Sequence, residues 1–253
     1  MLFLCLVSSL VWRELQISIH IDYLLAGILV SVPFAFSFRV AFRRRERALE
    51  NLSLYKGSLQ SVVYTLSASK IDEGQKKEIR TIAGKLSDEL IDYLRGNRDD
   101  AHAVQERSHD IYLFLLRNNE TIKNTLFAKL SLFLFRVNKS IEFLLATRRH
   151  FIPWGPKMAV RVSIYLFAVL YPGTLLERTG FSVSFAYILA QTAIKGFMLI
   201  TFFNILQMLE NPFDVRSPDS IRLEDFRFEN FPEPEKLISS TEKIAKPDIE
   251  EEG

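Results

Sequence analysis

The sequence predicts an all-α membrane protein with several transmembrane helices and a large helical part outside the bilayer. Charged residues are nearly absent from 21–38 and 162–176 and sparse in 181–209, whereas 70–125 and 214–253 are rich in them. Apolar residues of the charged middle segment recur every three or four positions, which is the spacing of amphipathic helices. This segregation is typical of a helical membrane protein with a soluble part.

Residues 22–66 form the longest predicted element, one helix that begins apolar and continues cationic. A helix of that length extends about 67 Å, about twice the hydrocarbon thickness of a bilayer, so it leaves the membrane as a helix. Arg43, Arg44 and Arg45 follow the apolar part, and the positive-inside rule makes that end cytoplasmic. Pro33 predicts a kink or a local loosening within the apolar part.

One bulky stripe runs along the apolar half of this helix. Val30, Phe34 and Phe38 recur every four residues and therefore share a face, with small residues between them that permit close helix approach. The spacing alone is compatible with two interpretations, packing within a helix bundle or the lining of a pore.

The first twelve residues, MLFLCLVSSLVW, are apolar but too short to cross a bilayer alone. They lack a basic segment and a small-residue cleavage site, so a signal peptide is the less favoured interpretation. We predict a short first transmembrane helix that ends near Leu15.

Three further helices are predicted in the charged part, over residues 72–95, 99–117 and 120–149. Gly96 closes the first, and Asn118 breaks the second. The third contains a nearly membrane-like run, but its lysine and arginine residues favour a helix packed on others over a transmembrane span.

A second hydrophobic region is predicted to form a membrane hairpin. Residues 151–156 contain two prolines and a glycine and are expected to form a non-helical elbow. A helix over 157–170 is expected to end at Tyr171-Pro172-Gly173, and a turn at 177–180 precedes the last helix, 181–209.

Lys195 lies near the middle of the last hydrophobic helix. An ammonium group at that depth is costly unless it meets water or a partner. The sequence leaves both a partnered packing role and a functional role open.

The chain becomes polar after Glu210. Alternating apolar residues in 221–228 predict an extended segment that lies along the soluble helices, and the chain after about residue 235 has a disordered composition. The predicted organisation has four parts: the first and long helices in 1–66, the cytoplasmic helices in 67–150, the elbow and hairpin in 151–209, and the cytoplasmic C-terminal segment in 210–253.

Several functional classes find no support in the sequence. The net charge of +2 and the motifs give no indication of nucleic-acid binding. The single cysteine, Cys5, and four scattered histidines do not have the spacing of metal ligands. No nucleophile–base set or phosphate-binding loop is recognisable, so an enzyme is not predicted.

Three segments together resemble the bestrophin family, in its bacterial type. They are FSFRVAFRRRERALENLSLYKGSL (36–59), RHFIPWGPKMAVRVSIYLFAVLYPG (149–173) and LENPFDVRSPDSIRL (209–223). They are similar to the end of the family's pore helix, to its proline-marked entry into the third membrane helix and to its proline-phenylalanine motif. Their order and spacing match the family, and the likeness spans about residues 1–230.

This resemblance implies a homopentamer around one central pore, with four transmembrane helices per subunit and a cytoplasmic helical bundle. Val30, Phe34 and Phe38 match the family's hydrophobic neck, and Ile152 matches its second, cytoplasmic constriction. Five copies of each neck residue would form stacked apolar rings, which block ions by dewetting when narrow.

The resemblance also bears on calcium. Asn211 and Asp219 match positions of the calcium clasp of eukaryotic relatives, but Arg216 and Met208 stand where oxygen donors would be needed. Calcium takes about six or more oxygen ligands, so we expect no strong calcium gating and no other cofactor.

The predicted function is therefore an ion channel, an integral multi-pass protein of the inner or plasma membrane, whose soluble helices and C-terminus are cytoplasmic. Its partners are the lipid bilayer, further copies of the chain and inorganic ions. Arg39 and Arg43 would favour anions such as chloride if they face the lumen. If they face lipid headgroups or form salt bridges to neighbours, they are structural charges and indicate nothing about selectivity. The alternatives are a cation (sodium) channel of the same fold, and a membrane-anchored interaction protein without a pore.

Overall fold

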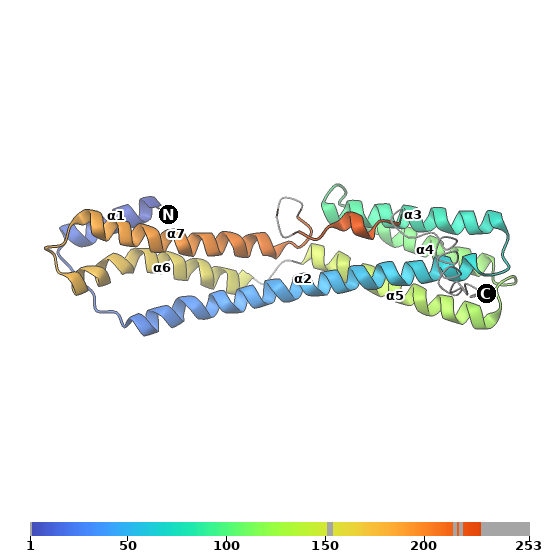
Figure 1. The fold of residues 1–253 in the computed structure, drawn as a ribbon, viewed down its shortest axis with the longest axis horizontal. Coiled ribbons are helices and arrows are strands. Elements are labelled where there is room, and N and C mark those ends of the chain that lie inside the picture. The colour runs from blue at the N-terminus through green and yellow to red at the C-terminus, as the bar shows by residue number, and fades with distance from the viewer. Residues whose placement is uncertain (1, 151–153, 215–216, 218–219, 229–253) are drawn as a thin grey trace, which may run out of the picture. The chain divides into compact units, whose positions relative to one another are not determined.

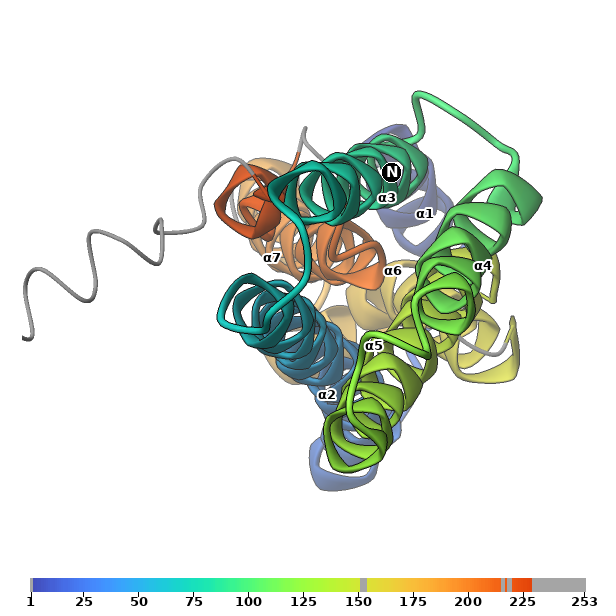
Figure 2. The same ribbon diagram turned by 90° about the vertical axis from the view of Figure 1, so that its right-hand side faces the viewer.

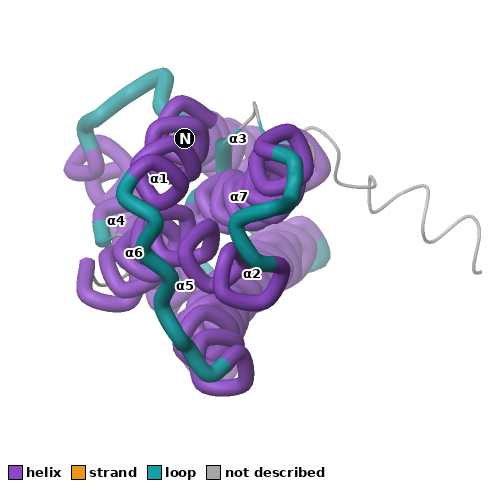
Figure 3. Tube along the Cα trace, turned by 90° about the vertical axis from the view of Figure 1, so that its left-hand side faces the viewer, coloured by secondary structure: helices purple, strands orange, loops and turns teal. Residues whose placement is uncertain are grey.

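A computed structural model describes residues 2–150, 154–214, 217 and 220–228, and every regular element among them is helical (Figures 1 and 3). The chain divides into a first unit, residues 1–46 and 150–220, and a second unit, residues 47–149 and the described residues from Ile221 onward. The elements are α1 (Leu2–Glu14), α2 (Tyr23–Ser67), α3 (Glu73–Arg95), α4 (Ala101–Arg117), α5 (Asn124–Arg149), α6 (Trp154–Thr179), α7 (Phe185–Glu210) and the 3-10 helix η1 (Leu223–Phe226).

The long helix is confirmed. α2 runs without interruption for 45 residues, contains Pro33, and contributes its first part to the first unit and the remainder to the second. A proline is tolerated inside such a helix because neighbouring groups can satisfy the carbonyl that loses its donor.

In the first unit, α1, α6 and α7 pack against one another (Figure 3). Glycines permit this close approach: a Cβ atom at Gly173 would come within 3.0 Å of the Trp12 ring, and one at Gly196 within 3.0 Å of Cys5 Sγ. Small residues at helix contacts are the usual device of membrane helix packing.

The predicted bounds of α6 are wrong at both ends. The helix already includes Trp154 and Gly155, because a proline in the first turn needs no backbone hydrogen bond. It also continues through Pro172 to Thr179. The carbonyl of Val169, one turn before this proline, accepts hydrogen bonds from Ser8 Oγ at 2.8 Å and Trp12 Nε1 at 2.7 Å. The carbonyl that loses its helical donor at Pro172 is that of Ala168, the residue before Val169, so the α1 side chains bind the carbonyl next to the interruption.

The hairpin between α6 and α7 is confirmed, with a later turn than expected. Glu177 to Thr179 are helical, and the turn begins at Gly180, whose φ of 75° lies in the left-handed region. α7 then starts at Phe185. At the other end of the hairpin, Lys157 Nζ and Glu210 Oε2 form an ion pair at 2.6 Å.

Two helices of the described residues are long and apolar enough to cross a membrane, over Lys157–Thr179 and Phe185–Glu210. α1 has 13 residues and spans only about 20 Å, less than the hydrocarbon core. The apolar part of α2 ends at Arg39. Of the four predicted transmembrane helices, the structure thus supports two by length and composition.

In the second unit, α3 packs on α4 and α4 on α5 (Figures 1 and 2). The predicted ends of α3 are confirmed by its caps. Asp72 accepts from the Gly74 amide at 3.1 Å while Gln75 Oε1 accepts from the Asp72 amide at 3.0 Å, and Gly96 is left-handed. α5 begins four residues later than predicted, because the Ile122 amide donates to the Asn118 carbonyl within a preceding turn.

The core of the second unit is the apolar face of these helices. α5 is not one of the two described helices that are long and apolar enough to cross a membrane, and it packs on α4 and α3. Its packing on other helices is therefore confirmed. Among the fully buried side chains are Leu52, Tyr55, Leu59, Leu86, Leu90, Ile111, Phe114, Leu130, Val137 and Leu144.

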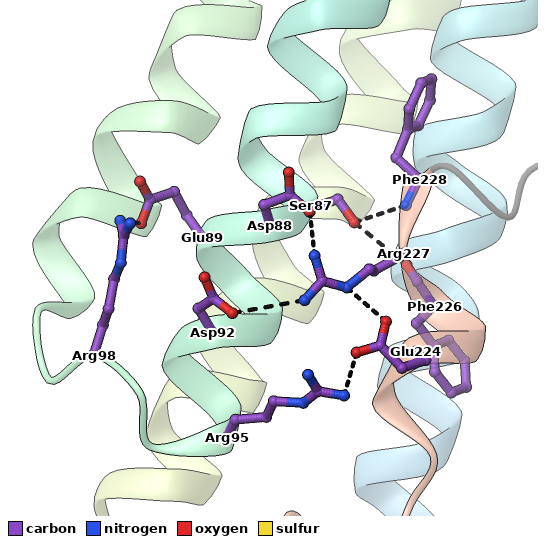
Figure 4. A network of polar contacts seen from close by, with 10 residues as sticks. All are labelled: Ser87, Asp88, Glu89, Asp92, Arg95, Arg98, Glu224, Phe226, Arg227 and Phe228. Atoms are coloured by element: carbon purple, nitrogen blue, oxygen red, sulfur yellow. Dashed lines mark hydrogen bonds and ion pairs between the residues drawn. The ribbon is translucent and has the colours of Figure 1, made fainter.

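The segment 221–228 lies against α3, as predicted, but it is not extended throughout, because Leu223–Phe226 form the 3-10 helix η1 (Figure 4). Arg227 forms ion pairs with Asp88 at 2.7 Å and with Asp92 at 3.6 Å. The Phe228 amide donates to Ser87 Oγ at 2.9 Å. Lys56 of α2 adds a hydrogen bond to the Asp225 carbonyl at 2.8 Å. The tail predicted to be disordered lies outside the described residues.

Candidate functional site

The stripe Val30–Phe34–Phe38 faces the interior of the first unit. Phe34 is only 8% exposed and belongs to a buried cluster with residues of α6 and α7, while Val30 and Phe38 pack against that cluster. The Phe34 and Phe38 rings stack with their centroids 6.4 Å apart. The partners of the stripe in this cluster include Val160, Ile164, Leu206 and Leu209.

A second stripe lies on the opposite face of α2. Ile28, Val32 and Phe36 are also spaced by four residues, and they are 52%, 59% and 56% exposed. At about 100° per residue, this face is turned roughly half a revolution from the first stripe. The sequence analysis did not identify this second stripe, although its spacing is as regular as that of Val30, Phe34 and Phe38. Periodicity shows that residues share a face of a helix, but it does not show what that face contacts.

The second stripe is continued by cations. Arg39 and Arg43 follow Phe36 by three and seven residues, which places them on the same face of the helix. Both side chains are exposed, and within the described residues neither forms an ion pair. This face of α2 therefore changes from apolar to positively charged toward the end of the first unit.

Lys195 is one of the side chains that line a cavity of about 480 Å³ between α2, α6 and α7. Its ammonium donates a hydrogen bond to the Tyr171 hydroxyl and lies 4.2 Å from the centre of the Tyr171 ring. The sequence left a partner and a function as alternatives, and the structure provides the partner. We call this hollow the Lys195 cavity; its remaining lining is Gly27, Val30, Ser31, Phe34, Phe38, Phe167, Met198, Leu199 and Phe202.

The positions that match the family's second constriction and calcium clasp are only partly within the described residues. Ile152 and Asp219 lie outside the described residues. Asn211 follows the end of α7, where its side-chain oxygen accepts from the Phe213 amide at 3.2 Å. In the part of the chain that the structure describes, no group of three acidic, histidine or cysteine side chains is arranged to hold a metal.

The described residues thus define an all-helical protein in which two helices are suited to crossing a membrane. No family model and no curated protein matches the chain by sequence. Its structure, in contrast, matches solved proteins over most of its length.

A bacterial bestrophin homologue from Klebsiella pneumoniae, solved as an alanine variant, gives a TM-score of 0.77 at 13% identity, covering 90% of this chain and 95% of that chain. Another structure of the Klebsiella homologue gives 0.73 at 13% identity, covering 89% and 92%. A structure described only as a membrane protein gives 0.75 at 12% identity, covering 90% and 94%. The chain therefore has the fold of bacterial bestrophin homologues, as the sequence resemblance predicted.

Proposed function

We propose that the chain forms a homopentameric ion channel whose pore is lined by the first part of α2. The observation that carries this proposal is the exposed face of α2, which is apolar at Ile28, Val32 and Phe36 and cationic at Arg39 and Arg43. A lumen can present both kinds of residue, and so can a lipid-facing helix whose arginines lie at the cytoplasmic interface, so the experiments below are chosen to distinguish the two. The fold shared with bestrophin homologues supports the same conclusion.

Two stripes of α2 compete for the neck of this pore. The resemblance favoured Val30, Phe34 and Phe38, but Phe34 is buried against α6 and α7 of its own subunit. The contacts of Phe34 within its own subunit favour the exposed stripe for a lumen between subunits. We therefore assign the neck to Ile28, Val32 and Phe36, whose fivefold rings would gate by dewetting.

The proposed ions are anions such as chloride. Five copies each of Arg39 and Arg43 at one end of the lumen would raise the local anion concentration and repel cations such as sodium. By the positive-inside rule this end is cytoplasmic, which makes the protein a multi-pass component of an inner or plasma membrane with the second unit in the cytoplasm. α1 and α2 would complete the four transmembrane helices.

The first experiment measures the oligomeric mass of the purified full chain in detergent. Five subunits are expected, and a monomer or dimer would rule out the pore. Recordings in planar bilayers then test conduction, with Phe36→Ala expected to raise the current because a smaller side chain widens and wets the ring. No conductance in either protein would support the membrane-anchored interaction protein instead.

Selectivity is tested by reversal potentials in asymmetric sodium chloride. An anion channel reverses near the chloride equilibrium potential, and replacing Arg39 and Arg43 by glutamine is expected to shift reversal toward the sodium potential. Lys129→Gln is a matched control, because this exposed lysine lies on α5 of the second unit. Reversal at the sodium potential in the wild type would establish the cation channel.

The proposed channel does not use calcium as a gating ligand. Asn211 Oδ1 is engaged by the Phe213 amide, and the sequence has Arg216 near it. Open probability is expected to be the same in calcium and in a calcium chelator, and a reversible loss of current on chelation would contradict this.

A further inference from the structure

Two arginines of the first unit lie over phenylalanine rings of α7. The Arg13 guanidinium lies 5.5 Å from the centre of the Phe185 ring, and the Arg161 guanidinium lies 5.6 Å from the centre of the Phe203 ring. The two rings are 18 residues apart on one uninterrupted helix, which corresponds to about 27 Å. Because the hydrocarbon core is about 30 Å thick, this spacing fits one arginine at each boundary of the bilayer.

Arg161 therefore belongs at the edge of the hydrocarbon core that lies near the start of α6. It follows the first residue of this helix, Trp154, by about two turns. Helical side chains lean toward the N-terminus of their helix, which favours a guanidinium directed to the membrane surface. Trp154 is exposed, and exposed tryptophans are enriched at membrane–water interfaces. At this depth the phosphate groups of lipids are within reach.

The charge of Arg161 is not neutralised by a neighbouring carboxylate. Lys157, one turn earlier on α6, forms an ion pair with Glu210 at 2.6 Å. Among the residues that the structure describes, Arg161 has only the Phe203 ring as a side-chain partner. A ring face attracts a guanidinium, but it carries no full negative charge and leaves N–H donors available. At the edge of the hydrocarbon core, such a half-buried cation is stabilised by an anion.

The surface of α6 that adjoins Arg161 is apolar. Tyr165 and Val169 follow Arg161 at intervals of four residues and therefore continue its face of the helix. Val162 lies beside them, and all three side chains are exposed. This face leads away from the boundary into the hydrocarbon core. A surface that is cationic at the boundary and apolar below it matches the chemistry of an anionic phospholipid.

We propose that Arg161 binds the phosphate of an anionic phospholipid such as phosphatidylglycerol, with an acyl chain along Val162, Tyr165 and Val169. The planar guanidinium donates two parallel hydrogen bonds to phosphate oxygens. A free phosphate ion would leave the apolar face uncovered, and a zwitterionic lipid carries a cation of its own that weakens the attraction. The site uses the membrane hairpin of the proposed channel but not its pore, so it is testable whether or not the chain conducts.

The test is native mass spectrometry of the purified full chain in detergent, titrated with phosphatidylglycerol or with phosphatidylcholine of identical acyl chains. The wild type is expected to retain more phosphatidylglycerol per chain. Arg161→Gln should weaken phosphatidylglycerol binding at least about tenfold and leave phosphatidylcholine binding unchanged, because the charge-assisted hydrogen bonds are lost. Arg136→Gln is the matched control, since this exposed arginine lies on α5 of the second unit and forms no ion pair within the described residues.

A second pair of variants keeps the arginine. Met158 lies three residues before Arg161 on the same side of α6 and is half-buried. Met158→Glu places a carboxylate beside the guanidinium and should abolish the preference for phosphatidylglycerol, whereas the neutral Met158→Gln should retain it. These variants decide the question even if Arg161→Gln does not fold.

Three results would overturn the proposal. Equal phosphatidylglycerol binding in the wild type, Arg161→Gln and Met158→Glu would show that anionic lipid binds elsewhere. Full competition by water-soluble glycerol phosphate would show a phosphate site without a role for the acyl chain. Dissociation of the oligomer in Arg161→Gln, with unchanged lipid per chain, would assign Arg161 to a contact between copies. A monomeric wild type that still binds phosphatidylglycerol through Arg161 would contradict the pore but not this site.

Discussion

Alanine substitutions of two neighbouring phenylalanines separate the two faces of α2. Phe34 is 8% exposed and contacts the cluster that includes Val160 and Ile164, whereas Phe36 is 56% exposed. In the cores of water-soluble proteins, Phe→Ala substitutions lower the free energy of unfolding by about 3–5 kcal/mol. Each Å³ of cavity that remains contributes about 24 cal/mol to this loss. In a membrane the side chain is not transferred from water, so only the cavity and the lost packing contacts contribute. We therefore expect Phe34→Ala to lower the free energy of unfolding by about 2 kcal/mol.

Phe36→Ala is expected to have the opposite profile. An exposed position of the subunit changes its free energy of unfolding by about 0.5 kcal/mol or less, but the proposed neck widens and the single-channel current rises. The assays are unfolding in mixed micelles, followed by tryptophan fluorescence, and planar-bilayer recording. Leu132→Ala, an exposed apolar position on α5, is the control and should change neither quantity.

Cysteine accessibility gives the same prediction a second readout. The single native cysteine, Cys5, is buried, so the background reaction with a charged, water-soluble thiol reagent is low. Phe36→Cys should react and block the current, and Phe34→Cys should not. If Phe34→Ala raises the current at unchanged stability while Phe36→Ala has no effect, the stripe predicted from the sequence lines the lumen and our assignment is wrong.

Three further predictions concern the second unit. Arg227→Met removes the cation that pairs with Asp88 and Asp92 (Figure 4), so hydrogen exchange at the Phe228 amide should accelerate several-fold, and an unchanged rate would contradict this. Burial raises the pKa of Tyr55 above its ordinary value of about 10; the unfolded chain therefore loses this proton first, stability falls as the pH rises above 10, and Tyr55→Phe should flatten that decline in thermal unfolding. Gly96→Ala should cost about 1 kcal/mol in denaturant unfolding because its φ is 91°, and no change would show that the cap relaxes.

Helix ends were predictable from the sequence wherever local chemistry determines them. α3 starts at a capping box and ends at a left-handed glycine, and both signals involve residues within one turn of the end. α2 was equally predictable, because its apolar and cationic halves join without a break signal.

The predicted end of α6 at a proline was wrong, because the local sequence does not show contacts with other helices. The segment around Pro172 contains the strongest local signal for a helix end, yet α6 continues to Thr179. Ser8 and Trp12, more than 150 residues away in the chain, donate to the Val169 carbonyl beside it. A local signal cannot include a donor that only the fold brings close.

The sequence by itself determined that this is an all-helical protein with hydrophobic and charged parts, that α2 is one long helix, and that the fold resembles that of the bestrophins. Composition and periodicity are properties of the chain, and they limit which surfaces each helix can bury. Only the tertiary structure decided which stripe of α2 is buried and which side chain accepts the hydrogen bond of Lys195. The two stripes have the same spacing and similar chemistry, so the choice depends on where α6 and α7 pack, and no local pattern encodes that.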